Sequence, residues 1–212
     1  MNDNQFNRNQ SSGLRIWHWL NAFVILGLLS TVGLHETLFN EKTNAQLFEK
    51  AAQSAGTPIT PKLAEDMAEG LITNLWDWHI YLGYALGVML LLRIVVAVVF
   101  KDCPLRALLN SFKEYKVATK GKGESLHYTL VRSSYLAFYL AVVFMVASGL
   151  SMIYSDKLHL SESFNHNLHE IHENFQYIFL VFIIGHLGGV IVAELGKYPG
   201  IVSNMINGGR RK

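Results

Sequence analysis

Nine histidines occur in this chain, and four that lie inside, or close to the ends of, long apolar stretches have positions that suit a shared role. An ionisable side chain in such a stretch is costly to bury, so its presence indicates a functional role. Neutral imidazole is also a common ligand of transition metals. The first candidates for chemistry are therefore His18, His79, His172 and His186.

His172 and His186 have the most informative spacing of the four. Fourteen residues separate them, about 40° short of four full helical turns, so both rings would share one helix face. They would stand about 21 Å apart along the axis, which is most of the roughly 30 Å hydrocarbon core of a bilayer. One helix thus presents a histidine near each membrane surface. His169 is the main rival to His172, but it lies about 100° from His186 around the axis and fits less well.

The depths of the other two histidines indicate how the four pair. His18 lies near the start of the first apolar stretch, at the level expected for His186. His79 begins the second stretch, at the level expected for His172. Two histidines that face each other across a bundle can bind one iron on opposite sides of a planar macrocycle, and haem is the natural occupant. The sequence therefore predicts two bis-histidine haems, bound by the pairs His18/His186 and His79/His172.

Residues near the four histidines also suit a haem site. Small residues, which let a macrocycle approach a helix, follow or flank the histidines at Ala22, Gly83, Gly87, Gly185, Gly188 and Gly189. Cations for the haem propionates are available at Arg15, Arg93 and Arg132. Both observations have ordinary alternatives, because glycine also serves tight helix packing and arginine can extend to lipid phosphates.

Three histidines leave a further option. His166, His169 and His172 follow one another at intervals of three, a spacing that can hold a surface metal ion, although the acids around them suit a solvated outer surface equally well.

Four apolar stretches must hold these side chains, at about 16–34, 78–100, 130–153 and 175–195. Each has close to the ~20 residues that a membrane helix needs, and only helices or closed barrels satisfy the backbone in lipid. We therefore predict an all-α integral membrane four-helix bundle that forms a single domain, 1–212, with a long outer loop at 35–77. Pro58 and Pro61 divide this loop, so we expect two short surface helices in it.

Composition and charge placement agree with a membrane protein. The chain is 50% hydrophobic and only 16% charged, which excludes a disordered chain and a nucleic-acid-binding protein. Cys103 is the one cysteine, so neither an internal disulfide nor a covalently attached c-type haem is available. Outside the stretches, twelve lysines and arginines fall in the two terminal segments and the 101–124 loop, against four in the other loops. This asymmetry predicts that both termini are cytoplasmic.

Four segments of the chain carry a recognisable pattern. They are Arg15-Ile16-Trp17-His18-Trp19-Leu20-Asn21-Ala22, the stretch from Asp77-Trp78-His79-Ile80-Tyr81-Leu82-Gly83-Tyr84 to Arg93, the spacing of His172 and His186, and the ending 198–209. Together they resemble the bacterial superfamily of cytochromes b-561 and the b-type cytochrome subunits of nickel-iron hydrogenases. Apart from the 35–77 loop, the resemblance covers nearly the whole chain.

The resemblance implies a multi-pass protein of the bacterial inner membrane, with lipid around it and two haem b groups held by the same four histidines. It implies electron exchange between the quinone pool and a partner in a respiratory chain: a hydrogenase, another dehydrogenase or reductase, or a cytochrome c. A quinone would need a proton donor near one haem. The candidates for that donor are His127, Tyr128 and Arg132 on one side and His159 and His169 on the other. An alternative with the same fold is a stand-alone superoxide–quinone oxidoreductase. The competing class is a non-haem transporter or assembly factor, although the inverted repeats or broken spans of a transporter are not visible.

Overall fold

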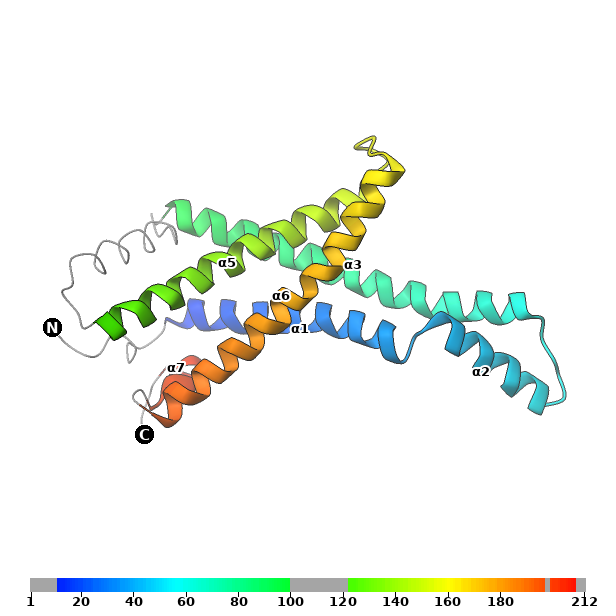
Figure 1. Ribbon diagram of the computed structural model, residues 1–212, viewed down its shortest axis with the longest axis horizontal. Helices are drawn as coiled ribbons and strands as arrows, with labels where there is room; N and C mark the ends of the chain where they lie inside the picture. The colour runs from blue at the N-terminus through cyan, green and yellow to red at the C-terminus, as the bar shows by residue number, and fades with distance from the viewer. Residues whose placement is uncertain (1–10, 100–121, 197–198, 209–212) are drawn as a thin grey trace. The chain divides into compact units, whose positions relative to one another are not determined.

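The computed structural model describes residues 11–99, 122–196 and 199–208, and the side chains of the second range from Ser133 onward. Within these ranges the regular elements are α-helices, and no strand occurs (Figure 1). Four helical segments are long and apolar enough to cross a membrane: Ser12–Thr37, Pro61–Val99, Ser133–Ile153 and Glu162–Leu195. The prediction of an all-α protein with four membrane helices is confirmed.

The chain falls into two compact units, and each is described by itself. The smaller unit is Leu20–Gly87, and the larger unit joins Met1–Trp19 to Val88–Lys212. Helix α1 (Ser12–Thr37) and helix α3 (Pro61–Val99) each contribute residues to both units. His79 belongs to the smaller unit, whereas His18, His172 and His186 belong to the larger one.

In the smaller unit, α1 and α3 run antiparallel. Three successive turns of α1 meet α3 in reverse order: Gly27 lies against Leu82, Thr31 against His79, and His35 against Trp76. A Cβ at Gly27 would stand 3.0 Å from the Leu82 side chain, so the missing side chain permits this close approach. The antiparallel pair therefore holds His79 at a fixed position against α1.

Helix α2 (Glu41–Ser54) and the first turns of α3 form the rest of the smaller unit. Asn40 caps α2 by accepting a hydrogen bond from the Thr43 N–H. Ala45, Ala64 and Ala68 are buried together, with Phe48 and Ile59 packed against them. These small residues let two helices with few large apolar side chains approach closely.

The 35–77 segment corrects the sequence prediction. The first expected surface helix is present as α2, but the second is not separate, because α3 begins at Pro61 and continues without a break. Proline is favoured at the first position of a helix, where its missing N–H is not needed. The apolar stretch that begins near residue 78 therefore marks where lipid-compatible sequence starts and not where the helix starts.

In the larger unit, α5 (Lys122–Ile153) and α6 (Glu162–Leu195) form an antiparallel hairpin (Figure 1). Phe144 contacts Phe175 near the connection, and Phe138 stacks on Phe182 further along, with ring centroids 4.1 and 4.5 Å apart. Helix α6 begins thirteen residues before the predicted 175, because Ser161 caps it by accepting from the Phe164 N–H.

The C-terminal segment folds back onto the start of α1. Helix α7 (Ile201–Asn207) lies between two glycines with positive φ, Gly200 and Gly208. The Glu194 carboxylate accepts from the backbone N–H groups of Gly200 and Val202, at 2.9 and 3.0 Å. Trp19 donates its indole N–H to the Met205 carbonyl at 3.1 Å. The last turn of α6 and the first turns of α1 thus both hold the tail.

We expect Ala68→Leu to loosen the packing of α2 on α3. Ala68 is fully buried, so the larger side chain would overpack the contact, at a cost of about 1–3 kcal/mol. Limited proteolysis of the full chain should then cleave the 41–60 segment faster than in the wild type. Met67→Leu is the matched control, since Met67 is 47% exposed. Equal cleavage of all three proteins would show that the buried alanines do not hold α2.

Candidate functional site

The rings of His18 and His186 lie next to each other in the larger unit. His18 is on the second turn of α1 and His186 is in the last three turns of α6. Their ring centroids are 6.2 Å apart, and their planes are inclined by 56°. Two imidazoles that are far apart in the sequence therefore lie close together, and both of their helices are apolar.

This separation matches two ligands on opposite sides of one metal ion. A metal–imidazole bond is about 2 Å long and the ring centre lies about 1 Å beyond the bound nitrogen, so two such ligands have ring centres about 6 Å apart. Among the described residues, no group of three or more histidine, cysteine, aspartate or glutamate side chains is placed to hold a metal. Two imidazoles without further protein ligands suit an iron whose other four ligands come from a porphyrin.

Aromatic side chains surround the two rings. Phe182 stacks on His186, with centroids 6.0 Å apart and planes only 3° from parallel, and Trp19 meets His18 edge-on at 5.5 Å. Phe138 in turn contacts Phe182 and Phe179. These contacts form an apolar wall, which is the environment that a porphyrin plane requires.

Glycines beside the histidines leave room for a macrocycle. A Cβ at Gly185, Gly188 or Gly189 would meet no atom within 4 Å, and the same holds for Gly83, four residues after His79. The open space at these glycines fits their predicted role, which is to let a macrocycle approach the helix. It also fits a helix face that is exposed to lipid.

Two of the three predicted cations lie in the larger unit near His18. Arg93 donates from Nε to the Tyr139 hydroxyl at 3.3 Å, and its guanidinium lies over the Trp17 ring at 5.9 Å. Arg15 donates to the Ile206 carbonyl and to the Ser12 hydroxyl through its two Nη atoms. Its Nε is buried and has no hydrogen-bond partner among the described residues, so its N–H could donate to a propionate. The side chain of Arg132 lies outside the described residues.

His79 and His172 each meet a buried hydroxyl group. Thr31 Oγ1 lies 2.7 Å from Nδ1 of His79, within the smaller unit. Ser148 Oγ lies 2.7 Å from Nδ1 of His172, within the larger unit. The sequence alone does not identify these partners, since Ser30 and Ser151 offer hydroxyl groups in the same helices.

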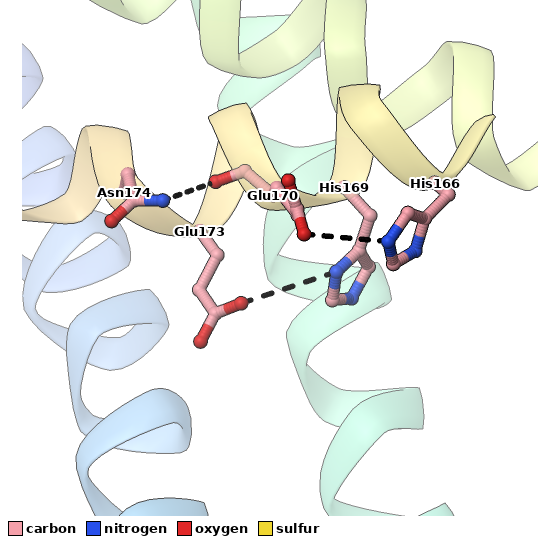
Figure 2. Close-up of polar contacts among 5 residues, drawn as sticks. All are labelled: His166, His169, Glu170, Glu173 and Asn174. Carbon is pink, nitrogen blue, oxygen red and sulfur yellow. Dashed lines mark hydrogen bonds and ion pairs between the residues drawn. The ribbon is translucent and has the colours of Figure 1, made fainter. Parts of the chain in front are cut away.

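The histidines at the start of α6 form ion pairs with acids one turn further along. His166 pairs with Glu170 at 3.3 Å, and His169 pairs with Glu173 at 4.0 Å (Figure 2). All four side chains are exposed. In the described part of the chain these residues do not combine with His172 into a three-ligand metal group. The surface-metal option is thus not supported, and the solvated-surface interpretation accounts for the acids.

The proposed quinone donors are only partly described. His159 has a left-handed backbone, with φ of 51°, in the turn between α5 and α6. The side chains of His127 and Tyr128 lie outside the described residues.

Comparison with known protein families gives a match over nearly the whole chain. The family described as prokaryotic cytochrome b561 matches residues 9–208. Neither the curated proteins nor the solved structures contain a match.

We expect Gly208→Ala to release the tail from α1. The Gly208 φ of +79° is strained for alanine by about 1–2 kcal/mol, and the added Cβ would stand 2.8 Å from Arg15 Nη1. Hydrogen exchange of the 201–207 amides should therefore become faster. Gly13→Ala is the control, because a Cβ there meets nothing within 4 Å. Unchanged exchange in Gly208→Ala would mean that the contact with Arg15 does not hold the tail.

Proposed function

The chain belongs to the prokaryotic cytochrome b561 family, and from that premise we propose that it binds two haem b groups and carries electrons between a partner redox protein and the quinone pool. That it is a membrane b-type cytochrome of electron transfer follows from the family and from its four apolar helices. The number of haems, their ligands and the quinone are the proposal.

One observation carries this proposal: the 6.2 Å separation of the His18 and His186 rings inside an aromatic wall. These two histidines would hold the iron of one haem. A bound haem supplies one-electron redox chemistry, with a potential that depends on its ligands and surroundings. Phe182 and Trp19 add apolar surface beside the two rings, while Arg15 and Arg93 would supply positive charge for the propionates.

For the second haem we propose His79 and His172 as ligands. The support is the fourteen-residue spacing of His172 from His186 and the depth of His79 in its own apolar stretch. Each histidine also has a buried hydroxyl at Nδ1, the kind of outer partner that ligand histidines commonly have.

Location and partner follow the charge pattern and the family. We propose a multi-pass protein of the bacterial inner membrane, in which the whole chain acts as one membrane domain with both termini in the cytoplasm. A hydrogenase, another dehydrogenase or reductase, or a cytochrome c would exchange electrons with it. Family membership favours an electron carrier over a non-haem transporter or assembly factor.

Separate replacement of the histidines tests the ligand assignment. Purified wild-type protein should show two b-type haems per chain in reduced-minus-oxidised spectra. His186→Ala and His172→Ala should each remove one haem and leave the other, because the two residues serve different sites. His169→Ala, on the same helix and in the rival position, should keep both. Full haem content in His172→Ala, or loss in His169→Ala, would contradict the assignment.

Exchange with quinol tests the link to the quinone pool. Anaerobic addition of excess reduced quinone to the oxidised protein should reduce haem, as followed by the b-type absorption bands. Dithionite addition to the same sample gives the full extent of reduction as the control. Haem that stays oxidised with quinol, yet is reduced by dithionite, would rule out direct coupling to the pool.

A further inference from the structure

Thr31 is a buried hydroxyl whose one proton has a defined acceptor. Its side chain is 6% exposed. Its Oγ1 lies 2.7 Å from the Leu28 carbonyl oxygen, three residues earlier on the same helix, and 2.7 Å from Nδ1 of His79. A hydroxyl has one hydrogen to donate and two lone pairs that accept. The carbonyl oxygen has no hydrogen, so at 2.7 Å the hydroxyl must donate to it.

Ser148 repeats this arrangement on a different helix. It is 3% exposed. Its Oγ lies 2.8 Å from the Phe144 carbonyl and 3.2 Å from the Met145 carbonyl, and 2.7 Å from Nδ1 of His172. The Ser148 hydroxyl group again donates its hydrogen to the carbonyls of its own helix. Both hydroxyl oxygens can therefore only accept from the histidine that they meet.

These donor and acceptor roles determine the tautomer of both imidazoles. If the oxygen accepts, Nδ1 must carry a hydrogen and donate it. The neutral ring then has its remaining lone pair on Nε2, and Nε2 is the atom that binds a metal. Thr31 and Ser148 thus select, for His79 and His172, the tautomer that a haem ligand needs.

We propose that Thr31 and Ser148 are positioning residues for haem ligation: they fix the tautomer and the orientation of His79 and His172 and make both rings stronger electron donors to iron. The inference rests on the proposed function, because it requires these two histidines to be ligands. A hydrogen bond donated from the outer nitrogen raises the basicity of the ligand nitrogen. A more basic ligand favours ferric over ferrous iron, so the two hydroxyls lower the reduction potential of the haem that they serve.

His18 and His186 provide an internal comparison. Among the described residues no hydrogen bond to either ring occurs, and their neighbours are Trp19 and Phe182. The reduction potential of the haem that they would hold is therefore not lowered by such a hydroxyl group. A change at Thr31 or Ser148 should act on one haem and leave the other as it was.

The test is a redox titration of the purified full-length holoprotein, followed by visible spectra and by low-spin ferric EPR. Thr31→Val keeps the shape of the side chain and removes the hydroxyl, and Ser148→Ala does the same at the second position. Each should raise the midpoint potential of one haem and shift the EPR signal of that haem, with the other haem unchanged. Weaker retention of the same haem, by about 10-fold or more, is the expected companion effect.

Two neighbouring hydroxyls give matched controls. Ser30 donates to the Leu26 carbonyl and Ser151 to the Ala147 carbonyl, so each has the same backbone bond without a histidine partner. Ser30→Ala and Ser151→Ala should leave both potentials and both EPR signals in place. Thr31→Ser, which keeps the hydroxyl, should restore the wild-type potential.

The outcomes separate this inference from the proposed function. A wild-type protein without two haems would end the proposed function, and the inference with it. Two haems whose potentials do not move in Thr31→Val and Ser148→Ala would overturn the inference alone. If Thr31→Val loses one haem, Thr31→Ser must recover it; failure to do so would show that shape, and not the hydroxyl, matters at this position.

Discussion

The structure depends on placing imidazole rings inside apolar helices. An imidazole has two nitrogens, and each needs a partner when water is excluded. For His79 and His172 one partner is a hydroxyl that has already donated its own proton to the helix backbone. This leaves one way to satisfy the ring, with Nδ1 as donor and Nε2 as acceptor. This Nε2 is the atom that we propose as the iron ligand, since a metal ion can pair with a buried imidazole lone pair as a proton donor can.

Close helix approach is what makes these contacts possible. Gly27 admits the Leu82 side chain one turn from the contact between Thr31 and His79. Gly149, next to Ser148, has its Cβ position 3.4 Å from Cε1 of His172, so a Cβ there would touch the ring. A glycine near each hydroxyl thus favours the helix separation at which a short side chain can reach an imidazole. The same residues that suit ordinary tight packing therefore also suit the contacts of His79 and His172.

The sequence predicted the parts of the fold that follow from solvent preference and missed those that follow from helix termination. Hydropathy located four membrane helices, because lipid requires about 20 apolar residues whatever the packing. It placed the start of α6 near 175, although Ser161 and Pro61 carried start signals for α6 and α3. The hydroxyl partners of His79 and His172 could not be predicted from the sequence for another reason. Ser30 and Thr31 both offer a hydroxyl group, and which of the two meets His79 depends on the antiparallel pairing of α1 with α3.

The tail shows how a charged side chain can be prepared for a ligand. Glu194 accepts from Gly200 and Val202, which holds α7 against the end of α6. The final carbonyls of α7 then accept from Trp19 and Arg15. Together with the bond to Ser12, these bonds use one N–H of each Nη atom of Arg15, and the buried Nε has no hydrogen-bond partner among the described residues. A buried N–H of a cation is costly unless an acceptor arrives, and a propionate carboxylate would supply one. The tail therefore does more than cover the end of the helices, since it holds in place the side chain whose Nε we propose as a contact of a haem propionate.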